Sequence, residues 1–274
     1  MTRYPFGTAN HRRPRVTPAL NKAFAVAILS LLLPAAAMAQ PPGVTDALAA
    51  RLAAERGTAI EPGRYSAGEG RGFTIMPYRG KYLLRLDGMA ENFVLTADPA
   101  SLGAKLLKYD TGAAALSISI WGGVTLYASD APGGLPATHQ GGAGAFTPIA
   151  VSASELRSAL SDEAAHFSYA GDLTLQFVAD NSSLADPDAR ALAFDTLANV
   201  QGGIERIIAT AAGKRAVSRR ISTVKLEKAA KPGLALSGRN LVVRYAPQDG
   251  YLGRLSSHAV AQQLAKLLAV NPSE

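Results

Sequence analysis

The tetrapeptide Asp110-Thr111-Gly112-Ala113 is the segment whose residue types best suit catalysis. A carboxylate on a tight, glycine-containing loop can act with a second carboxylate as a pair that shares one proton and activates a water molecule. The tetrapeptide occurs once in the chain, so such a pair would need two copies of the protein. The competing interpretation is a three-residue hairpin loop in which Gly112 is left-handed.

This tetrapeptide is similar to the signature of retropepsin-like aspartic peptidases. The wider pattern of that family places apolar residues before the aspartate and Ser or Thr three positions after the alanine. Lys108, Tyr109 and Leu116 occupy these positions here. The departures favour the hairpin loop, and a homodimeric aspartic peptidase that uses Asp110 is the alternative function.

The histidines of the chain after residue 39 are His139, His166 and His258, and no two of them have the spacing of metal ligands. The chain has no cysteine that could complete a metal site. The sequence therefore indicates no catalytic residue, metal site or cofactor, and it favours a non-catalytic protein over an enzyme.

Basic residues are concentrated between positions 206 and 231, where Glu227 is the one acidic residue and no aromatic residue occurs. The patch would suit an anionic component of the cell envelope, such as phospholipid headgroups. It could instead be a solvated edge strand whose cations prevent sheet pairing, or a face that docks on the acidic first half. The lack of aromatic residues argues against single-stranded nucleic acid. The residues proposed to form the patch are Lys214, Arg215, Arg219, Arg220 and Lys225.

The two halves of the chain differ in the sign of their charge. Residues 40–188 carry 10 basic and 16 acidic residues, whereas residues 189–274 carry 13 basic and 5 acidic ones. This asymmetry predicts either an internal electrostatic contact or an anionic partner for the basic half. The whole of residues 40–274 is nearly neutral, with 23 basic against 21 acidic residues, which argues against a general affinity for nucleic acid.

Residues 40–129 form the predicted β-rich module. From about residue 71, apolar and polar residues alternate with the period of two that is typical of strands. Turn sequences such as Arg79-Gly80 and Gly122-Gly123 separate the strands. This spacing predicts an antiparallel meander of about six strands, either open or curled toward a barrel. The predicted strands are Phe73–Met76, Tyr82–Leu86, Asn92–Thr96, Ala104–Tyr109, Leu116–Ile120 and Val124–Tyr127.

Residues 130–150 are rich in glycine and proline and lack periodicity, so they are predicted to be a linker between two modules. Residues 151–274 then alternate between helical and strand-like patterns, which predicts a mixed helix and strand module and an α+β protein. A short helix before Gly57 is also predicted, starting at Thr45.

Several start and stop signals define the elements of the second module. Ser152 with Glu155 forms a possible capping box, and Asp186-Pro187 begins a helix that Gly213 could end. The Gly202-Gly203 pair inside that helix suggests the close approach of another backbone, or a bend. The remaining predicted elements are strands at Asp172–Val178, Ser218–Lys228 and Leu234–Tyr245 and a helix from Ser257.

The first 39 residues have the features of a cleavable secretory signal peptide. Residues 1–22 carry five basic and no acidic side chains, and the apolar stretch 23–33 is eleven residues long, whereas a membrane span needs about 20. Small residues follow, with an Ala-x-Ala site that predicts cleavage between Ala39 and Gln40. We therefore expect a periplasmic or secreted protein.

The β-rich module resembles a family of exported proteobacterial proteins of unknown function. The segments that carry the resemblance are Tyr82–Gly88, Lys108–Gly112 and Gly122–Tyr127, the last followed by Pro132-Gly133-Gly134. The resemblance implies export and a β-rich core and assigns no activity. Together with the basic patch, this resemblance favours an envelope-associated binding or scaffold protein. The sequence does not indicate the oligomeric state.

Overall fold

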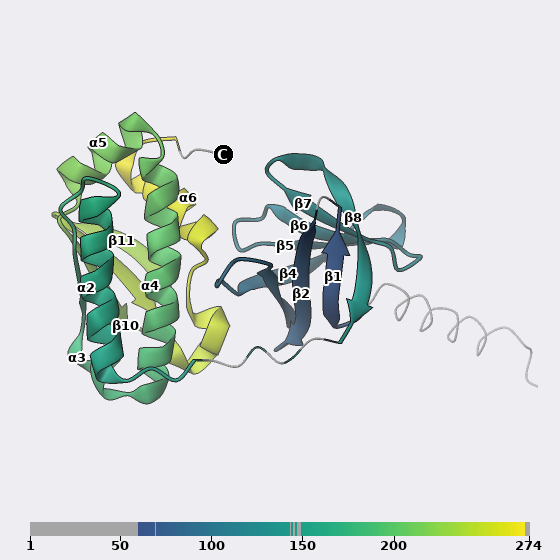
Figure 1. Cartoon of the computed structure of the whole chain (residues 1–274), viewed down its shortest axis with the longest axis horizontal. Helices are drawn as coiled ribbons and strands as arrows, with labels where there is room; N and C mark the ends of the chain where they lie inside the picture. The colour runs from purple at the N-terminus through teal and green to yellow at the C-terminus, as the bar shows by residue number, and fades with distance from the viewer. Residues whose placement is uncertain (1–59, 69, 143, 145, 147–148, 272–274) are drawn as a thin grey trace, which may run out of the picture. The chain divides into compact units, whose positions relative to one another are not determined.

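The structure is a computed structural model that describes residues 60–68, 70–142, 144, 146 and 149–271 (Figure 1). The predicted signal peptide and the predicted helix at residues 45–57 lie outside the described residues.

The first half of the described chain is a closed antiparallel barrel of eight strands, in which each strand pairs with the next and β1 pairs with β8. The prediction of about six strands therefore missed two, because the predicted strands correspond to β2–β7 and leave out β1 and β8. The strands are β1 (Gly63–Ala67), β2 (Arg71–Tyr78), β3 (Lys81–Leu86), β4 (Phe93–Pro99), β5 (Lys105–Lys108), β6 (Ala114–Ile118), β7 (Val124–Ala128) and β8 (Ala131–Gly141), with a short 3-10 turn at Ser101–Gly103.

Strand β8 corrects the prediction that residues 130–150 form a linker throughout. The first half of β8 pairs with β7 and its second half with β1, so it closes the barrel. Its prolines, Pro132 and Pro136, fall in the half that pairs with β7 alone, where a missing N–H costs little. An ideal Cβ on Gly134 would lie 2.5 Å from Thr125 Cγ2, so a glycine is needed there for close strand approach. The residues that suggested a loop therefore suit a closing strand.

The barrel interior is filled by side chains that alternate along the strands. The rings of Tyr65 and Phe73 are stacked with centroids 5.1 Å apart, and Phe73, Ile75 and Leu116 are fully buried. The predicted turn at Arg79-Gly80 is confirmed, because both residues have positive φ angles (47° and 77°), as a two-residue hairpin turn of this kind requires.

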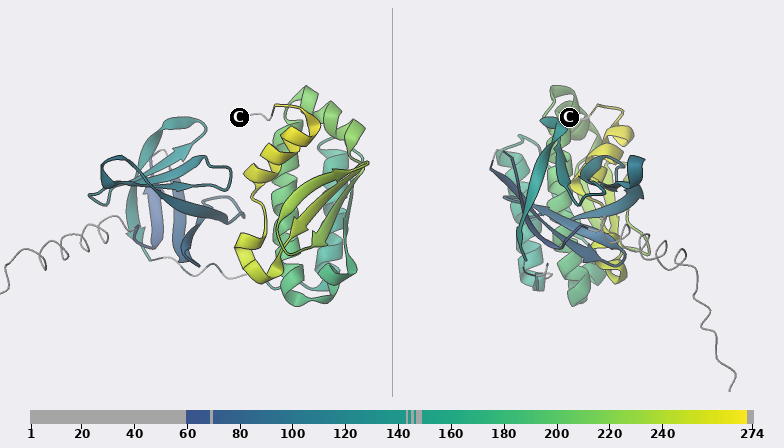
Figure 2. Two further views of the ribbon diagram at one scale, coloured as in Figure 1. Left: turned by 180° about the vertical axis from the view of Figure 1, so that it is seen from behind. Right: turned by 90° about the vertical axis from the view of Figure 1, so that its right-hand side faces the viewer.

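The second half is a four-stranded mixed sheet with helices packed on one face. Strand β10 lies between β9 and β12 and is parallel to both, while β11 is antiparallel to β12. Seen from behind, the strands lie in front of the helices (Figure 2). The elements are α2 (Ala153–Tyr169), β9 (Gln176–Ala179), α3 (Asn181–Ala185), α4 (Pro187–Ile208), α5 (Ala211–Arg220), β10 (Thr223–Lys228), β11 (Gly233–Ser237), β12 (Asn240–Tyr245), the 3-10 segment η2 (Pro247–Gly253) and α6 (Ser257–Leu268).

Helix starts in this half follow the sequence signals closely. The capping box of Ser152 and Glu155 is present, and Asp186 caps α4 with Pro187 in the first turn.

Two other predictions in this half need correction. Residues Ala211 to Arg220 form a separate helix, α5, which Thr210 caps. Gly213 therefore does not end α4, and Arg219 is not in a strand. The segment predicted as one strand at residues 234–245 is a hairpin of β11 and β12.

Gly203 allows α4 and α6 to approach each other closely, as the glycine pair predicted. An ideal Cβ on Gly203 would lie 2.4 Å from Val260 Cγ1 and 3.1 Å from the Ser257 carbonyl oxygen. No real side chain tolerates the first distance, so glycine is required for this helix contact. Within the described part of the chain, no helix is long and apolar enough to cross a membrane.

Candidate functional site

Asp110 lies in the β5–β6 turn, and its carboxylate is occupied by another part of the chain. The backbone amide and hydroxyl of Ser256 donate hydrogen bonds to it at 2.9 and 2.6 Å. Gly112 has φ 86°, and its N–H bonds to the Tyr109 carbonyl, as the hairpin-loop interpretation requires. The carboxylate thus binds the start of α6, and the geometry gives no support to a peptidase dyad.

The three histidines lie in different places. His139 is on β8, and Nε2 of His166 on α2 lies 2.8 Å from Glu205 Oε1. The ring of His258 packs against Phe93 and Tyr109, with centroids 5.1 and 4.8 Å away. Among the described residues, no three His, Asp or Glu side chains form a group that could hold a metal ion.

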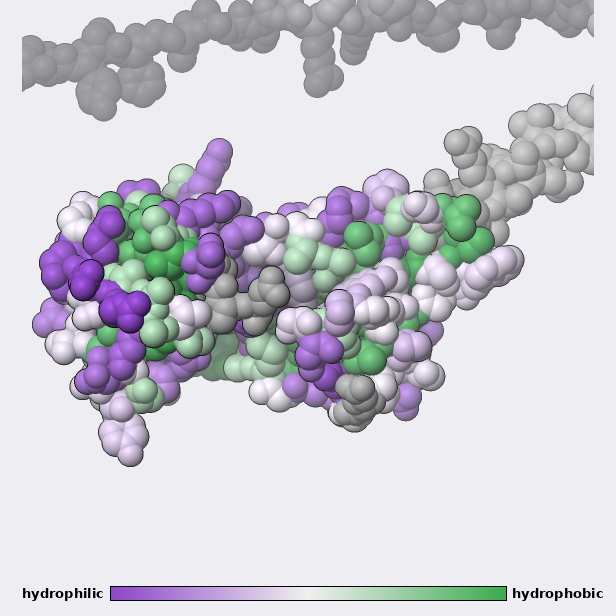
Figure 3. Space-filling model, turned by 90° about the horizontal axis from the view of Figure 1, so that it is seen from above, coloured by the Kyte–Doolittle hydropathy of each residue, from purple (hydrophilic) through white to green (hydrophobic). Residues whose placement is uncertain are grey.

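Helix α5 carries four of the five predicted patch residues and no acidic residue. Its buried side is made by Gly213 and Val217, whereas Arg215, Arg219 and Arg220 are exposed. Seen from above, the half that contains α5 shows hydrophilic residues around a hydrophobic patch (Figure 3). The edge-strand alternative is wrong for α5, since these cations stand on a helix.

The five patch residues differ in their partners. Lys214 Nζ lies 3.4 Å from Asp172, and Lys225, on the inner strand β10, pairs with Glu227 at 2.7 Å. For Arg215, Arg219 and Arg220 the described part of the chain supplies no ion-pair partner. Within that part, no patch residue pairs with a carboxylate of the barrel, but Lys214 pairs with Asp172, which belongs to the acidic half of the chain, residues 40–188. The docking alternative is therefore supported for Lys214 alone.

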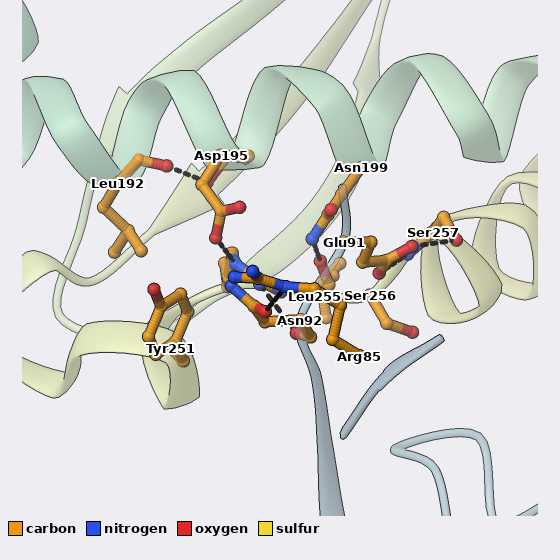
Figure 4. Close-up of polar contacts among 12 residues, drawn as sticks. Arg85, Glu91, Asn92, Leu192, Asp195, Asn199, Tyr251, Leu255, Ser256 and Ser257 are labelled. Atoms are coloured by element: carbon orange, nitrogen blue, oxygen red, sulfur yellow. Dashed lines mark hydrogen bonds and ion pairs between the residues drawn. The ribbon is translucent and has the colours of Figure 1, made fainter. Parts of the chain in front are cut away.

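The barrel contacts the second half of the chain at the N-terminus of α6. Both halves belong to one compact body, Val44–Glu274. Ser256 binds Asp110 as described, and the Ser257 backbone N–H and hydroxyl donate to Glu91 at 2.9 and 2.6 Å (Figure 4). Both serines are buried. Carboxylates at a helix N-terminus are stabilised by its free N–H groups and its dipole. This contact joins carboxylates of the acidic half to serines rather than to basic side chains, so it differs from the contact between opposite charges that the sequence predicted.

A second polar network lies beside this contact and centres on Asn92, which immediately precedes β4 (Figure 4). Arg254 donates from Nη2 to the Asn92 carbonyl oxygen at 2.8 Å and from Nε to Asp195 on α4. Asn92 Oδ1 accepts from Arg85 Nε on β3 at 2.7 Å. Arg254 has only 1% of its side chain exposed, so its charge relies on these partners.

Burial shifts the pKa of several groups in this region. It raises the pKa of Glu91 and of Asp195, although Ser257 and Arg254, respectively, oppose the shift. Burial, reinforced by nearby Arg206, lowers the pKa of His258 to about 4, and burial raises that of Tyr109 to about 12. Clustered pKa shifts of this kind are common at binding sites and also at structural ion pairs.

A cleft of about 320 Å³ opens next to the Asn92 network. Its apolar lining includes Leu192 and Phe194 of α4 and Tyr251 of η2, and its polar lining includes Arg85 and Asp195. Tyr251 packs edge-on against Tyr78 of β2, with centroids 5.6 Å apart. A mostly apolar cleft with a few convergent polar groups is the usual form of a small-molecule site.

Sequence patterns did not reveal this network, because its members are single residues far apart in the chain; the bonded pair Arg254 and Asn92 is separated by 162 positions. The one local signal was the pair Ser256-Ser257 before a helical pattern, which marks a helix start but not what binds there.

Comparison with known proteins finds a family. A family model described as a domain of unknown function, DUF4908, matches residues 45–264. No curated protein and no solved structure matches the chain.

Proposed function

Because the chain belongs to the DUF4908 family, whose function is unknown, we propose its function from its own surface. We propose an exported, non-catalytic binding protein that contacts an anionic component of the cell envelope through α5. The observation that carries this proposal is the unpaired state of Arg215, Arg219 and Arg220 among the described residues, on a helix without acidic residues.

The chemistry of α5 supports an anionic partner. Arginine binds phosphate through a planar fork of donors, so three neighbouring arginines suit phospholipid or phosphate-bearing polymer headgroups. Arg239 adjoins the same end of the helix, since its Nη2 donates to the Ser218 carbonyl oxygen at 3.2 Å. The absence of aromatic residues between positions 206 and 231 favours headgroup contact over nucleic acid.

Export rests on the first 39 residues, whose charge and apolar pattern match a cleavable signal. We expect the protein recovered from its native compartment to begin at Gln40. Intact-mass measurement of that protein tests this expectation, and a mass that includes residues 1–39 in the exported form would contradict it.

Vesicle binding tests the role of α5. We expect the protein lacking residues 1–39 to cosediment with phosphatidylglycerol-containing vesicles at low salt, and not with pure phosphatidylcholine vesicles. Binding should weaken strongly at high salt, because exposed charges are screened over about 10 Å at 0.1 M. Arg215→Gln/Arg219→Gln should weaken binding about tenfold or more.

The matched control is Arg157→Gln/Lys231→Gln, which removes two exposed cations from α2 and from the β10–β11 loop. This control should bind vesicles like the wild type. Equal loss in both variants would show that total charge, rather than α5, determines binding, and absence of binding at either salt would remove the membrane proposal.

A further inference from the structure

We propose that the cleft beside Asn92 binds a small amphiphilic anion, with a carboxylate or phosphate head held by Arg85 and an apolar body on the aromatic wall. This site is separate from α5 and goes beyond the envelope contact.

Arg85 is oriented like an anion receptor. Asn92 Oδ1 fixes its Nε at 2.7 Å, and its guanidinium lies over the ring of Phe146, 4.6 Å from the centroid. The two Nη groups, which form the open side of the fork, have no hydrogen-bond partner in the described part of the chain. A guanidinium held in this way presents two parallel N–H donors, the geometry that matches a carboxylate or phosphate.

Asn92 is well suited to hold Arg85 in place. Only 4% of Asn92 is exposed, and its backbone carbonyl is bound by the buried Arg254. The residue that orients Arg85 is therefore buried, and its backbone is held in place before any ligand arrives. Such pre-organisation reduces the entropy lost when an anion binds.

No acidic group of the cleft forms an ion pair with Arg85 in the described part of the chain, although Arg85 interacts electrostatically with Asp195. Both oxygens of Glu91 accept hydrogen bonds from Ser257, and Asp195 is paired with Arg254. Arg79, a second cation of the lining, bonds through Nη1 to the Gln248 carbonyl oxygen, which carries no net charge. Asp188 also lines the cleft without an ion-pair partner among the described residues, so the net charge of the lining does not select the ligand. The choice of an anion rests on the open Nη groups of Arg85.

The walls define the rest of the ligand. Phe194, Leu192 and Tyr251 offer apolar surface, and about 320 Å³ suits a molecule the size of a medium-chain acid or a small aromatic acid. A free inorganic ion would leave this apolar surface unused, so the ligand should carry both a charged head and an apolar body.

The test uses the protein without residues 1–39 and three probes of equal chain length, decanoate, decyl phosphate and decanol, measured by isothermal titration calorimetry. We expect one or both anions to bind and decanol to bind at least tenfold more weakly. Preference between the two anions identifies the head group. Failure of both anions to bind, or equal binding of decanol, would overturn the proposal.

Variants locate the binding. Arg85→Gln should weaken anion binding about 10- to 100-fold, because a charged bidentate contact is lost. Arg85→Lys keeps the charge but not the fork and should give an intermediate loss. Arg157→Gln, on the exposed side of α2, is the matched control and should bind like the wild type.

Two further measurements separate this proposal from its alternatives. Unchanged thermal unfolding of Arg85→Lys would show that its loss of binding does not come from unfolding. Arg215→Gln/Arg219→Gln should keep decanoate binding, while Arg85→Gln should keep vesicle binding, so the two proposals fail independently. Wild-type anion affinity in both Arg85 variants would contradict the assignment of Arg85.

Discussion

Replacing Arg254 with methionine should lower the free energy of unfolding by about 3–5 kcal/mol, the usual cost of removing one partner of a buried ion pair. The substitution leaves Asp195, with 23% of its side chain exposed, without its ion-pair partner, and leaves the Asn92 carbonyl without its donor. Methionine preserves most of the packed volume, so the effect reports the lost charge rather than a cavity. Urea unfolding followed by circular dichroism measures it.

The double variant Arg254→Met/Asp195→Leu is the informative comparison. Removing both charges should restore most of the lost stability, because a buried pair often contributes little beyond an apolar pair of similar size. Arg71→Met is the surface control, since Arg71 contacts Asp130 where both side chains are more exposed, and it should change stability much less. If Arg254→Met costs no more than this control, the Asn92 network is not a stabilising feature.

The second prediction concerns acid pH. The pKa of His258 is about 4 in the folded protein against 6.5 for an unperturbed histidine, so between these values the unfolded chain binds a proton that the folded chain does not. Stability from this group is complete above about pH 6.5 and falls as the pH drops to about 4. The loss amounts to about 3 kcal/mol at the lower end.

His258→Phe should remove this slope while keeping a ring between Phe93 and Tyr109. The free energy of unfolding of each protein is measured by urea titration from pH 7.5 to pH 4. The difference in free energy of unfolding between the two proteins at pH 7.5 reports packing alone. The change in that difference between pH 7.5 and pH 4 reports the protonation of His258.

Glu91 and Asp195, whose raised pKa values give the opposite slope, are present in both proteins and largely cancel in this difference. A constant difference across the range would contradict a lowered pKa of His258. So would an NMR titration of its ring with a midpoint near 6.5.

Features set by neighbouring residues could be predicted from the sequence. The capping box at Ser152, the Asp186-Pro187 helix start and the Arg79-Gly80 turn each depend on a few consecutive positions. Strand β8 escaped prediction because its glycines and prolines are tolerated only through its pairing with β7 and β1. Helix α5 escaped because Gly213, which lies in its first turn, has the residue type of a helix end.

The candidate site was less predictable because it, too, depends on contacts between residues that are far apart in the sequence. The patch cations could be found as a run of like charge, but their partners depend on which element each occupies, as Lys225 and Glu227 on β10 show. Arg85, Asn92 and Arg254 belong to no motif, and only the fold brings them together.

The contact between Asp110 and Ser256 has a consequence for how the protein is made. The two residues are 146 positions apart, so at about 5–20 residues per second Asp110 is synthesised roughly 7–30 s before its binding partner Ser256. During that interval the carboxylates of Asp110 and Glu91 have only water as a partner at this contact. All strand pairs of the barrel lie within residues 63–141, so they need no part of α6. If the chain folds as it is made, α6, close to its end, is one of the last elements to join the assembly.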